Sequence, residues 1–257
     1  MRPMQALRFP HTGVHLRWPR SSPQPPAAGV QIVTESSSPS RADHSSSRQI
    51  HWDKIYKEKP ETGVSWYQSS PEPSLGQIRR LARRRDSPII DIGGGASLLA
   101  DRLLETGFTK LTVLDVSEIA LGHVRARLGT RAQEVRWIVG DVIAVEGIGR
   151  QEIWHDRAVF HFLTDPSDRR RFVERVAECV IPGGHVLIAA FALDGPKQCS
   201  GLPVERYDVD RLASEFGPGF SLLESDHRTH VTPWGAPQSF THAVFRARSP
   251  LTEEQEP

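Results

Sequence analysis

The chain has 257 residues, of which 38% are hydrophobic and 25% are charged, and its formal net charge is +1. This length and composition predict one globular domain with a sizeable core and some additional tail. The nearly balanced charge gives no field that would favour nucleic acid or a membrane surface, and no apolar run approaches the roughly 20 residues that span a bilayer.

Residues 1–48 differ in composition from the rest of the chain. They are rich in Ser and Pro and show no hydrophobic periodicity, so we expect a disordered N-terminal tail. Six arginines against only Glu35 and Asp43 would also suit an organelle transit peptide, although the prolines interrupt an amphipathic helix. The two cysteines are too few for a disulfide framework and show no metal-type spacing, which favours a reducing, cytoplasmic location with an organelle as the alternative.

Folded structure is expected to begin near Ile50. The stretch HWDKIYKEKPETGVSWYQ carries four aromatic side chains, and residues 73–84 have the apolar spacing of a helix. The basic run at 79–85 is interpreted as the solvated end of that helix, where cations suit the helix dipole.

From residue 87 onward, strands and helices alternate. We expect strands at 87–92, 110–117, 135–142, 152–160 and 185–192, with helices at 97–106, 118–128, 167–180 and 208–216. Asp165 or Ser167 is the expected cap of the third of these helices, with Pro166 near its first turn. Two late strands, at 220–229 and 239–247, have no helix between them and should pair as an antiparallel hairpin.

Repeated strand–helix pairs predict an α/β fold, a Rossmann-like doubly wound sheet in a single domain. We place this domain at residues 49–248 and expect a disordered C-terminal tail at 249–257. In such sheets, ligands bind beyond the carboxyl ends of the strands, where the strand order reverses.

Three glycines, Gly93, Gly94 and Gly95, follow the first strand at that edge. Glycines here serve either a tight strand-to-helix turn or the close approach of a ligand to the backbone. Two acids favour a ligand: Asp115 ends the second strand, where a carboxylate can accept from both ribose hydroxyls, and Asp141 ends the third. Either acid alone could be a simple cap, but the set predicts a bound nucleoside.

The type of nucleoside follows from what the loop lacks. A dinucleotide site needs a third glycine for the pyrophosphate, and Ser97 stands near that place instead. Asp91, just before the loop, disfavours a pyrophosphate and suits a ligand with a positive centre, or fixes the loop. S-adenosylmethionine combines a ribose, an adenine amine, an ammonium and a sulfonium, and is the predicted cofactor.

The ordered motifs IIDIGGGASLLA, LTVLDVS, VGDV and PGGHVLIAAF resemble those of class I S-adenosylmethionine-dependent methyltransferases. The resemblance covers residues 50–248 and implies a seven-stranded sheet, mostly parallel, with an antiparallel last strand. It implies that Asp91 and the glycine loop line the methionine part of the cofactor. The residues implied for the ribose and the adenine are Asp115, Val116, Asp141 and Val142. The aromatic stretch and IWHDRAVFHFL look more like the thiopurine and tellurite-resistance branch.

The fourth strand ends at HDRAVFHF, beside the expected position of the transferred methyl. Asp156 and His161 are the candidates for positioning the acceptor or removing a proton, followed by His155 and Arg157. Alternatively, Asp156 pairs with Arg157 and His161 packs under the following helix.

Further residues are expected near the substrate. Trp66 or Tyr67 is predicted near the sulfonium, although the aromatic side chains can equally anchor this segment to the core. The long segment 193–212 is expected to form part of the substrate wall, and the histidines at 227 and 230 have no regular metal spacing.

The predicted activity is methyl transfer to a small molecule bearing a thiol, a chalcogen or a carboxylate. The alternatives are a protein-lysine acceptor, a non-catalytic cofactor binder and a nicotinamide oxidoreductase. The sequence predicts no nucleic-acid or membrane partner and no metal, and it leaves the oligomeric state open.

Overall fold

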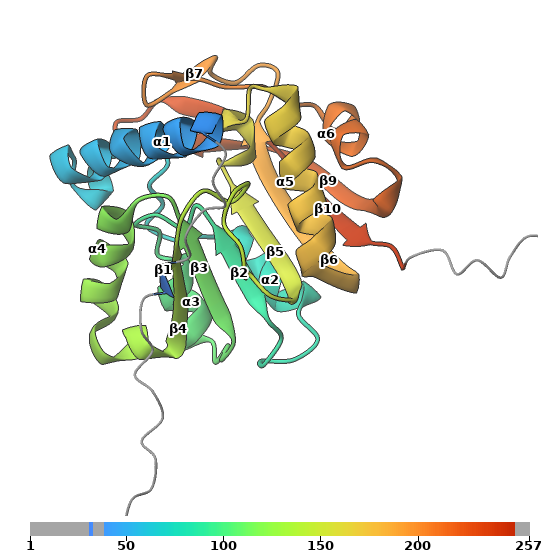
Figure 1. The fold of residues 1–257 in the computed structure, drawn as a ribbon, viewed down its shortest axis with the longest axis horizontal. Coiled ribbons are helices and arrows are strands. Elements are labelled where there is room, and N and C mark those ends of the chain that lie inside the picture. Colours follow the sequence, from blue (N-terminus) through green and yellow to red (C-terminus); the bar gives the residue numbers. More distant parts are fainter. Residues whose placement is uncertain (1–30, 33–38, 250–257) are drawn as a thin grey trace, which may run out of the picture.

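The structure, a computed structural model, describes residues 31–32 and 39–249. A twisted sheet of eight strands crosses this part of the chain in the order β1-β4-β3-β2-β5-β6-β10-β9 (Figure 1). Its strands are β1 (Gln31–Ile32), β2 (Ile89–Ile92), β3 (Leu111–Asp115), β4 (Val135–Val139), β5 (Gln151–Arg157), β6 (Val180–Phe191), β9 (Phe220–Val231) and β10 (Pro237–Ala247).

The strand pairing confirms the predicted fold class. The strands from β1 to β6 pair in parallel, whereas β10 lies antiparallel between β6 and β9. The seven predicted strands all form, and the last strand of the chain is the antiparallel one. The two-residue strand β1 joins β4 at the edge and adds an eighth strand that the sequence did not predict.

Helices cover both faces of the sheet. Those described are α1 (Pro39–Glu58), α2 (Ser74–Leu81), α3 (Leu99–Glu105), α4 (Glu118–Leu128), α5 (Pro166–Cys179) and α6 (Val209–Phe216), with short 3-10 turns η1 (Glu61–Gly63), η2 (Gly129–Glu134), η3 (Phe160–Phe162) and η4 (Gly217–Gly219). Apolar residues of α2, α3 and α4 form one core cluster with one side of the sheet. Residues of α5 and α6 form the other cluster on the opposite side.

The neighbouring strand residues Ile89 and Ile90 belong to opposite clusters, because successive side chains of a strand point to opposite faces. Both are fully buried. A run of consecutive apolar residues is therefore the expected sequence of a parallel strand that is covered on both faces.

Helix ends follow the polar residues next to them. The hydroxyl of Ser117 accepts a hydrogen bond from the backbone N–H of Ala120 at the start of α4. Of the two predicted caps of α5, Asp165 is the one observed, accepting from the backbone N–H of Ser167 with Pro166 as the first helical residue. These local signals explain why the bounds of α4 and α5 agree with the prediction to within one residue.

Two segments differ from their predicted form. Strand β6 begins at Val180 rather than at 185 and includes the PGG sequence, with a register irregularity against β5. The long segment at 193–212 contains a small hairpin of β7 (Gln198–Cys199) and β8 (Leu202–Pro203) that was not predicted, ahead of the predicted helix α6.

The predicted boundary of the N-terminal tail at residue 48 is corrected. Helix α1 begins at Pro39, so residue 48 lies inside a helix. Serine-rich helices have weak intrinsic propensity, and this one is held by contacts that the local sequence does not reveal. Of the predicted C-terminal tail, residues 250–257 lie outside the described residues.

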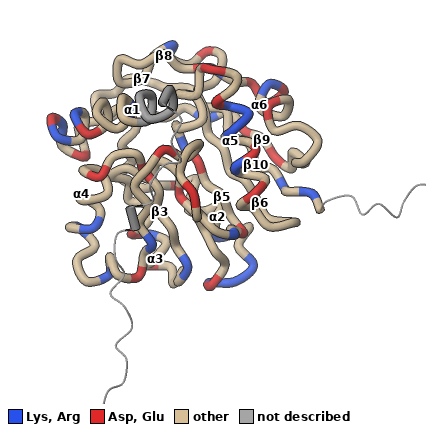
Figure 2. Tube along the Cα trace, in the orientation of Figure 1, with Lys and Arg blue, Asp and Glu red and all other residues tan. Residues whose placement is uncertain are grey.

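Helix α1 lies over the carboxyl ends of the parallel strands (Figure 1). The strand order reverses between β2 and β5, and the space beyond this switch point is where doubly wound sheets bind ligands. Basic and acidic residues are interspersed along the described chain (Figure 2). None of the described helices is both long enough and apolar enough to cross a bilayer.

Candidate active site

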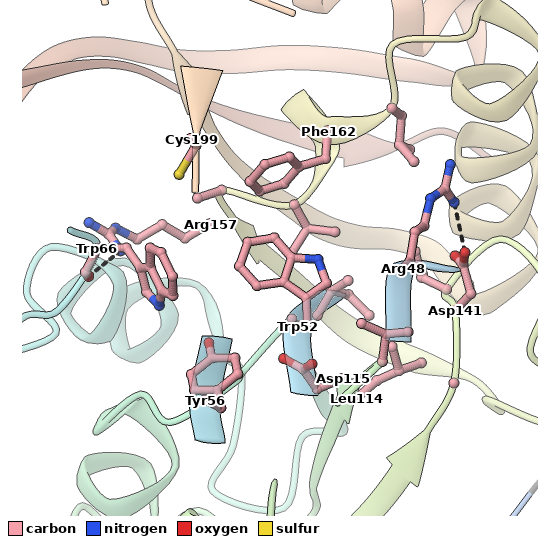
Figure 3. A pocket seen from close by; sticks show the side chains of 18 residues that line it. Arg48, Trp52, Tyr56, Trp66, Leu114, Asp115, Asp141, Arg157, Phe162 and Cys199 are labelled. Carbon is pink, nitrogen blue, oxygen red and sulfur yellow. Dashed lines mark hydrogen bonds and ion pairs between the residues drawn. The ribbon is translucent and has the colours of Figure 1, made fainter. Parts of the chain in front are cut away.

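A cleft lies between α1 and the carboxyl edge of the sheet (Figure 3). Its empty volume, including the part open to solvent, is about 780 Å³, within the range of small-molecule sites. Helix α1 contributes Arg48, Trp52 and Tyr56 to one wall, and Asp115 and Asp141 lie on the opposite wall. The two predicted strand-end carboxylates thus face a single cavity.

The glycine loop is tightly packed against the rest of the site. The N–H of Gly93 donates to the carbonyl of Leu114 at 2.7 Å, and its φ of +61° lies in the left-handed region. A Cβ at Gly93 would lie 2.0 Å from a methyl of Val159, and one at Gly95 would lie 2.4 Å from the hydroxyl of Tyr56. The loop therefore needs glycine for its own packing, and its role toward a ligand stays a prediction.

The carboxylate of Asp115 points at the glycine loop. Its Oδ2 accepts from the N–H of Gly95 at 2.8 Å, and its Oδ1 accepts from the N–H of Ser117 at 2.8 Å. Burial raises the pKa of Asp115 to about 7, while these two backbone donors oppose the shift. A carboxylate has about four acceptor positions, so two donors leave capacity for ligand hydroxyls.

Asp141 is held at the other end of the cleft. Nη1 of Arg48 donates to its Oδ2 at 2.7 Å, and Nη2 of Arg48 donates to Asp168 of α5 at 2.5 Å. The side chains of Val116 and Val142 also line this end. Arg48 thereby ties α1 to the sheet across the cleft.

Asp91 and His155 form a buried pair behind the glycine loop. Oδ1 of Asp91 lies 2.7 Å from Nδ1 of His155, whose Nε2 lies 2.8 Å from the hydroxyl of Ser74. Asp91 lies on a second, adjoining cavity that also reaches Gly93 and Gly94. The pair fixes the orientation of this carboxylate, since both ring nitrogens of His155 are engaged.

Trp66 lies at the end of the cleft opposite Asp141 (Figure 3). Trp66 borders both cavities, and its ring contacts Trp52 edge-on, with the centroids 5.6 Å apart. Tyr67 borders only the second cavity. Trp66 therefore anchors the segment and faces the cleft at the same time, so both predicted roles are compatible with its position.

Residues 90–186 match a family model described as "Methyltransferase domain". The matched range runs from β2 to the middle of β6 and includes the glycine loop and both strand-end carboxylates. Residues 90–186 are therefore identified as a methyltransferase domain. The predicted family, fold and type of enzyme are confirmed at this level.

The chain is also similar to proteins named "eEF1A lysine and N-terminal methyltransferase". The mouse (Mus musculus) protein is 23% identical over 96 residues, which is 37% of this chain and 14% of that protein. The chain thus matches only a small part of the length of this curated relative.

Solved structures share the fold at low sequence identity. The N-methyltransferase NodS from Bradyrhizobium japonicum, solved with S-adenosyl-L-homocysteine, has a TM-score of 0.60 and 16% identity, covering 77% of this chain and 100% of that one. TehB from Haemophilus influenzae has a TM-score of 0.57 and 14% identity, covering 77% and 67%.

The two predicted catalytic residues of the methyltransferase domain are buried beside the cleft and do not line it. Asp156 accepts from the N–H groups of Val159 and Phe160, and burial raises its pKa to about 7. His161 accepts from the N–H of Phe191 through Nδ1, and burial lowers its pKa to about 3. Both hold the turn after β5 in place, and a catalytic role for either stays a prediction.

Sequence reasoning did not assign functional roles to several residues that line the cleft. Arg48 falls within the predicted tail, and the aromatic segment of Trp52 and Tyr56 was expected either to close over the site or to anchor to the core, without a role for either residue alone. Arg157 was a secondary candidate, and the structure shows no ion pair between it and Asp156 among the described residues. In the sequence HDRAV, Arg157 follows His155 by two residues, so the two side chains share one face of β5. Because His155 lies beside Asp91 of β2, this is also the face of Asp91.

The late histidines serve other contacts. His227 lies 3.1 Å from Asp194, and His230 lies 2.7 Å from the carbonyl oxygen of Ser65. Within residues 31–32 and 39–249, no group of three or more potential ligands comes together as a metal site.

Proposed function

We propose that this chain transfers a methyl group from S-adenosylmethionine to a small-molecule acceptor. The observation that carries the proposal is the single cleft that Asp115, Asp141 and the glycine loop share under α1. Bound there, S-adenosylmethionine would supply an electrophilic methyl on a sulfonium whose leaving group is a neutral thioether.

The residues of the cleft fit the parts of this cofactor. Asp115 has free acceptor positions for ribose hydroxyls, and Asp141 has one for an exocyclic amine beside the apolar surfaces of Val116 and Val142. Gly93 borders both cavities and Gly94 borders the second, so the backbone of the loop can be reached by a ligand there. The carboxylate of Asp91, held by His155, lies where a cationic amino group would be stabilised.

Helix α1 acts as the cover of this site. Trp52 and Tyr56 line the cleft from α1, and the hydroxyl of Tyr56 lies close to Gly95, so we expect α1 to move outward when a ligand enters and to close over it afterwards. Once closed, their rings exclude water from the reacting atoms, which strengthens electrostatic interactions there.

The acceptor end of the cleft favours a small molecule. Trp66, Phe162 and Cys199 wall this end, and the β7–β8 hairpin that carries Cys199 lies over it. In-line displacement needs the acceptor held in line with the methyl–sulfur bond, and an enclosed wall supplies that alignment. A protein amine is the second candidate, because the curated relatives are named as protein methyltransferases.

The test has two arms. Calorimetry with S-adenosylhomocysteine should show binding to the wild type and at least tenfold weaker binding to Asp115→Ala. Transfer of labelled methyl groups into a lysate, divided into protein and small-molecule fractions, should label the small molecules. An absence of S-adenosylhomocysteine binding would refute the cofactor, whereas label confined to protein would favour the second candidate.

A further inference from the structure

Arg157, the last residue of β5, is a cation at the junction of the two cavities that forms no ion pair with any residue the structure describes. It borders the main cleft beside Ala158 and Cys199, and it borders the second cavity beside Asp91 and His155. Its Nη1 donates to the carbonyl oxygen of Trp66 at 3.0 Å (Figure 3). Its Nη2 is shut off from solvent and has no hydrogen-bond partner among the described residues.

The surroundings of Arg157 are almost entirely uncharged. Its guanidinium lies 5.1 Å from the ring centroid of Phe240. Burial lowers the pKa of His161 to about 3, and it raises the pKa of the Cys199 thiol to about 11, so both groups are neutral at physiological pH. Asp91, the carboxylate that acts on Arg157 through charge, is hydrogen-bonded to His155 instead.

Another buried arginine of the same domain shows the usual arrangement. Arg169 on α5 pairs with Glu215 at 2.7 Å and donates to the carbonyl oxygens of Leu163 and Thr164. Burial lowers the pKa of Arg157 to about 10, because no comparable partner offsets its desolvation. An unpaired, desolvated cation is costly for the fold, and an anionic ligand would offset that cost.

We propose that Arg157 binds a carboxylate of a ligand in this active site. A guanidinium presents parallel N–H donors that match a carboxylate, and Nη2 is a donor still available. Two ligands can supply the carboxylate: the acceptor, in the main cleft, or the amino-acid end of the cofactor, in the second cavity. The inference rests on the proposed function, because both ligands belong to it.

The same charge disfavours a cationic acceptor. A protonated lysine side chain entering past Trp66 would meet Arg157 and be repelled, because the repulsion between two cations is strong where little water screens it. Where the acceptor supplies the carboxylate, the acceptor class is a small organic acid with that carboxylate as its anchor.

The test compares Arg157→Gln, Arg157→Lys and the control Arg131→Gln in the full chain. Arg131 is the matched control because it is also an arginine. It forms an exposed ion pair with Glu134 and lines neither cavity. Binding of S-adenosylhomocysteine is measured against 5′-methylthioadenosine, which lacks the amino-acid part. Acetate and acetamide are titrated, with and without S-adenosylhomocysteine, and Trp fluorescence reports their binding.

If the cofactor supplies the carboxylate, Arg157→Gln should weaken S-adenosylhomocysteine at least tenfold and leave 5′-methylthioadenosine unchanged. If the acceptor supplies it, Arg157→Gln should abolish the binding of acetate, with acetamide inactive throughout. Arg157→Lys should show a smaller loss in the same arm, and it carries the test if the Gln variant does not fold. Unchanged binding in both arms overturns the proposal.

Failure of the proposed function gives a different result. A wild type that binds neither nucleoside refutes the cofactor, whatever the variants do. A wild type that binds both nucleosides, with variants that match it, refutes only the role of Arg157.

Discussion

The buried carboxylate of Asp115 predicts that nucleoside binding depends on pH near neutrality. Burial raises its pKa from 3.8 to about 7. Since the folded pKa lies above the unfolded one, the free energy of unfolding falls as the pH rises from about 4 to about 7 and stays lower by roughly 4 kcal/mol above that, at 1.36 kcal/mol per unit. Ribose hydroxyls donate to the ionised form, so a bound nucleoside should repay part of this cost and bind more tightly at higher pH.

The magnitude follows from the fraction ionised. With a pKa of about 7, roughly a tenth of Asp115 is ionised at pH 6 and roughly nine tenths at pH 8, so affinity should rise about tenfold over this range. Calorimetry with 5′-methylthioadenosine measures this directly, because the ligand carries no group that titrates there. The neighbouring hydroxyl of Tyr56 stays neutral, since burial raises its pKa further.

Two variants decide the origin of the effect. Asp115→Asn should bind weakly with little pH dependence. Asp156→Asn serves as the matched control, because burial also raises the pKa of Asp156 to about 7 but this residue does not line the main cleft. The reasoning is refuted if the wild type binds equally at pH 6 and pH 8, or if the slope survives in Asp115→Asn and disappears in Asp156→Asn.

Three further predictions test the cover, the loop and the thiol. Gly93→Ala should destabilise the protein by at least about 2 kcal/mol in thermal or urea unfolding, because the new Cβ would clash with Val159. Gly107→Ala is the control: its Cβ would have open space at a φ of +88°, so it should destabilise by roughly 1 kcal/mol. Equal losses in the two variants would contradict the packing argument. Arg48→Gln should speed proteolytic cleavage within α1 severalfold, because it removes the ion pair that joins α1 to Asp141. An unchanged rate would mean that this ion pair does not hold α1 in place. Cys199, whose thiol pKa is raised to about 11, should react with iodoacetamide far more slowly in the native than in the unfolded protein, and equal rates would show that the site is open.

The sequence by itself determined the layered fold and the cofactor end of the site. Consecutive apolar residues bounded by Gly93 and by the acids Asp115 and Asp141 predict buried parallel strands that end at one edge. Caps such as Ser117 and Asp165 fixed the helix bounds because capping is a contact between residues two or three apart. Such local signals are fully present in the chain order.

Only the tertiary structure decided the cover and the acceptor end. Arg48 meets Asp141 across 93 residues, which placed a helix where composition suggested a tail. Within the described part of the chain, the lack of an ion pair at Arg157 and the burial of His161 depend on β10 and the turn after β5, which pack around them. Residues distant in the chain determine which charges surround these side chains and how far solvent reaches them, so the local sequence cannot predict either quantity.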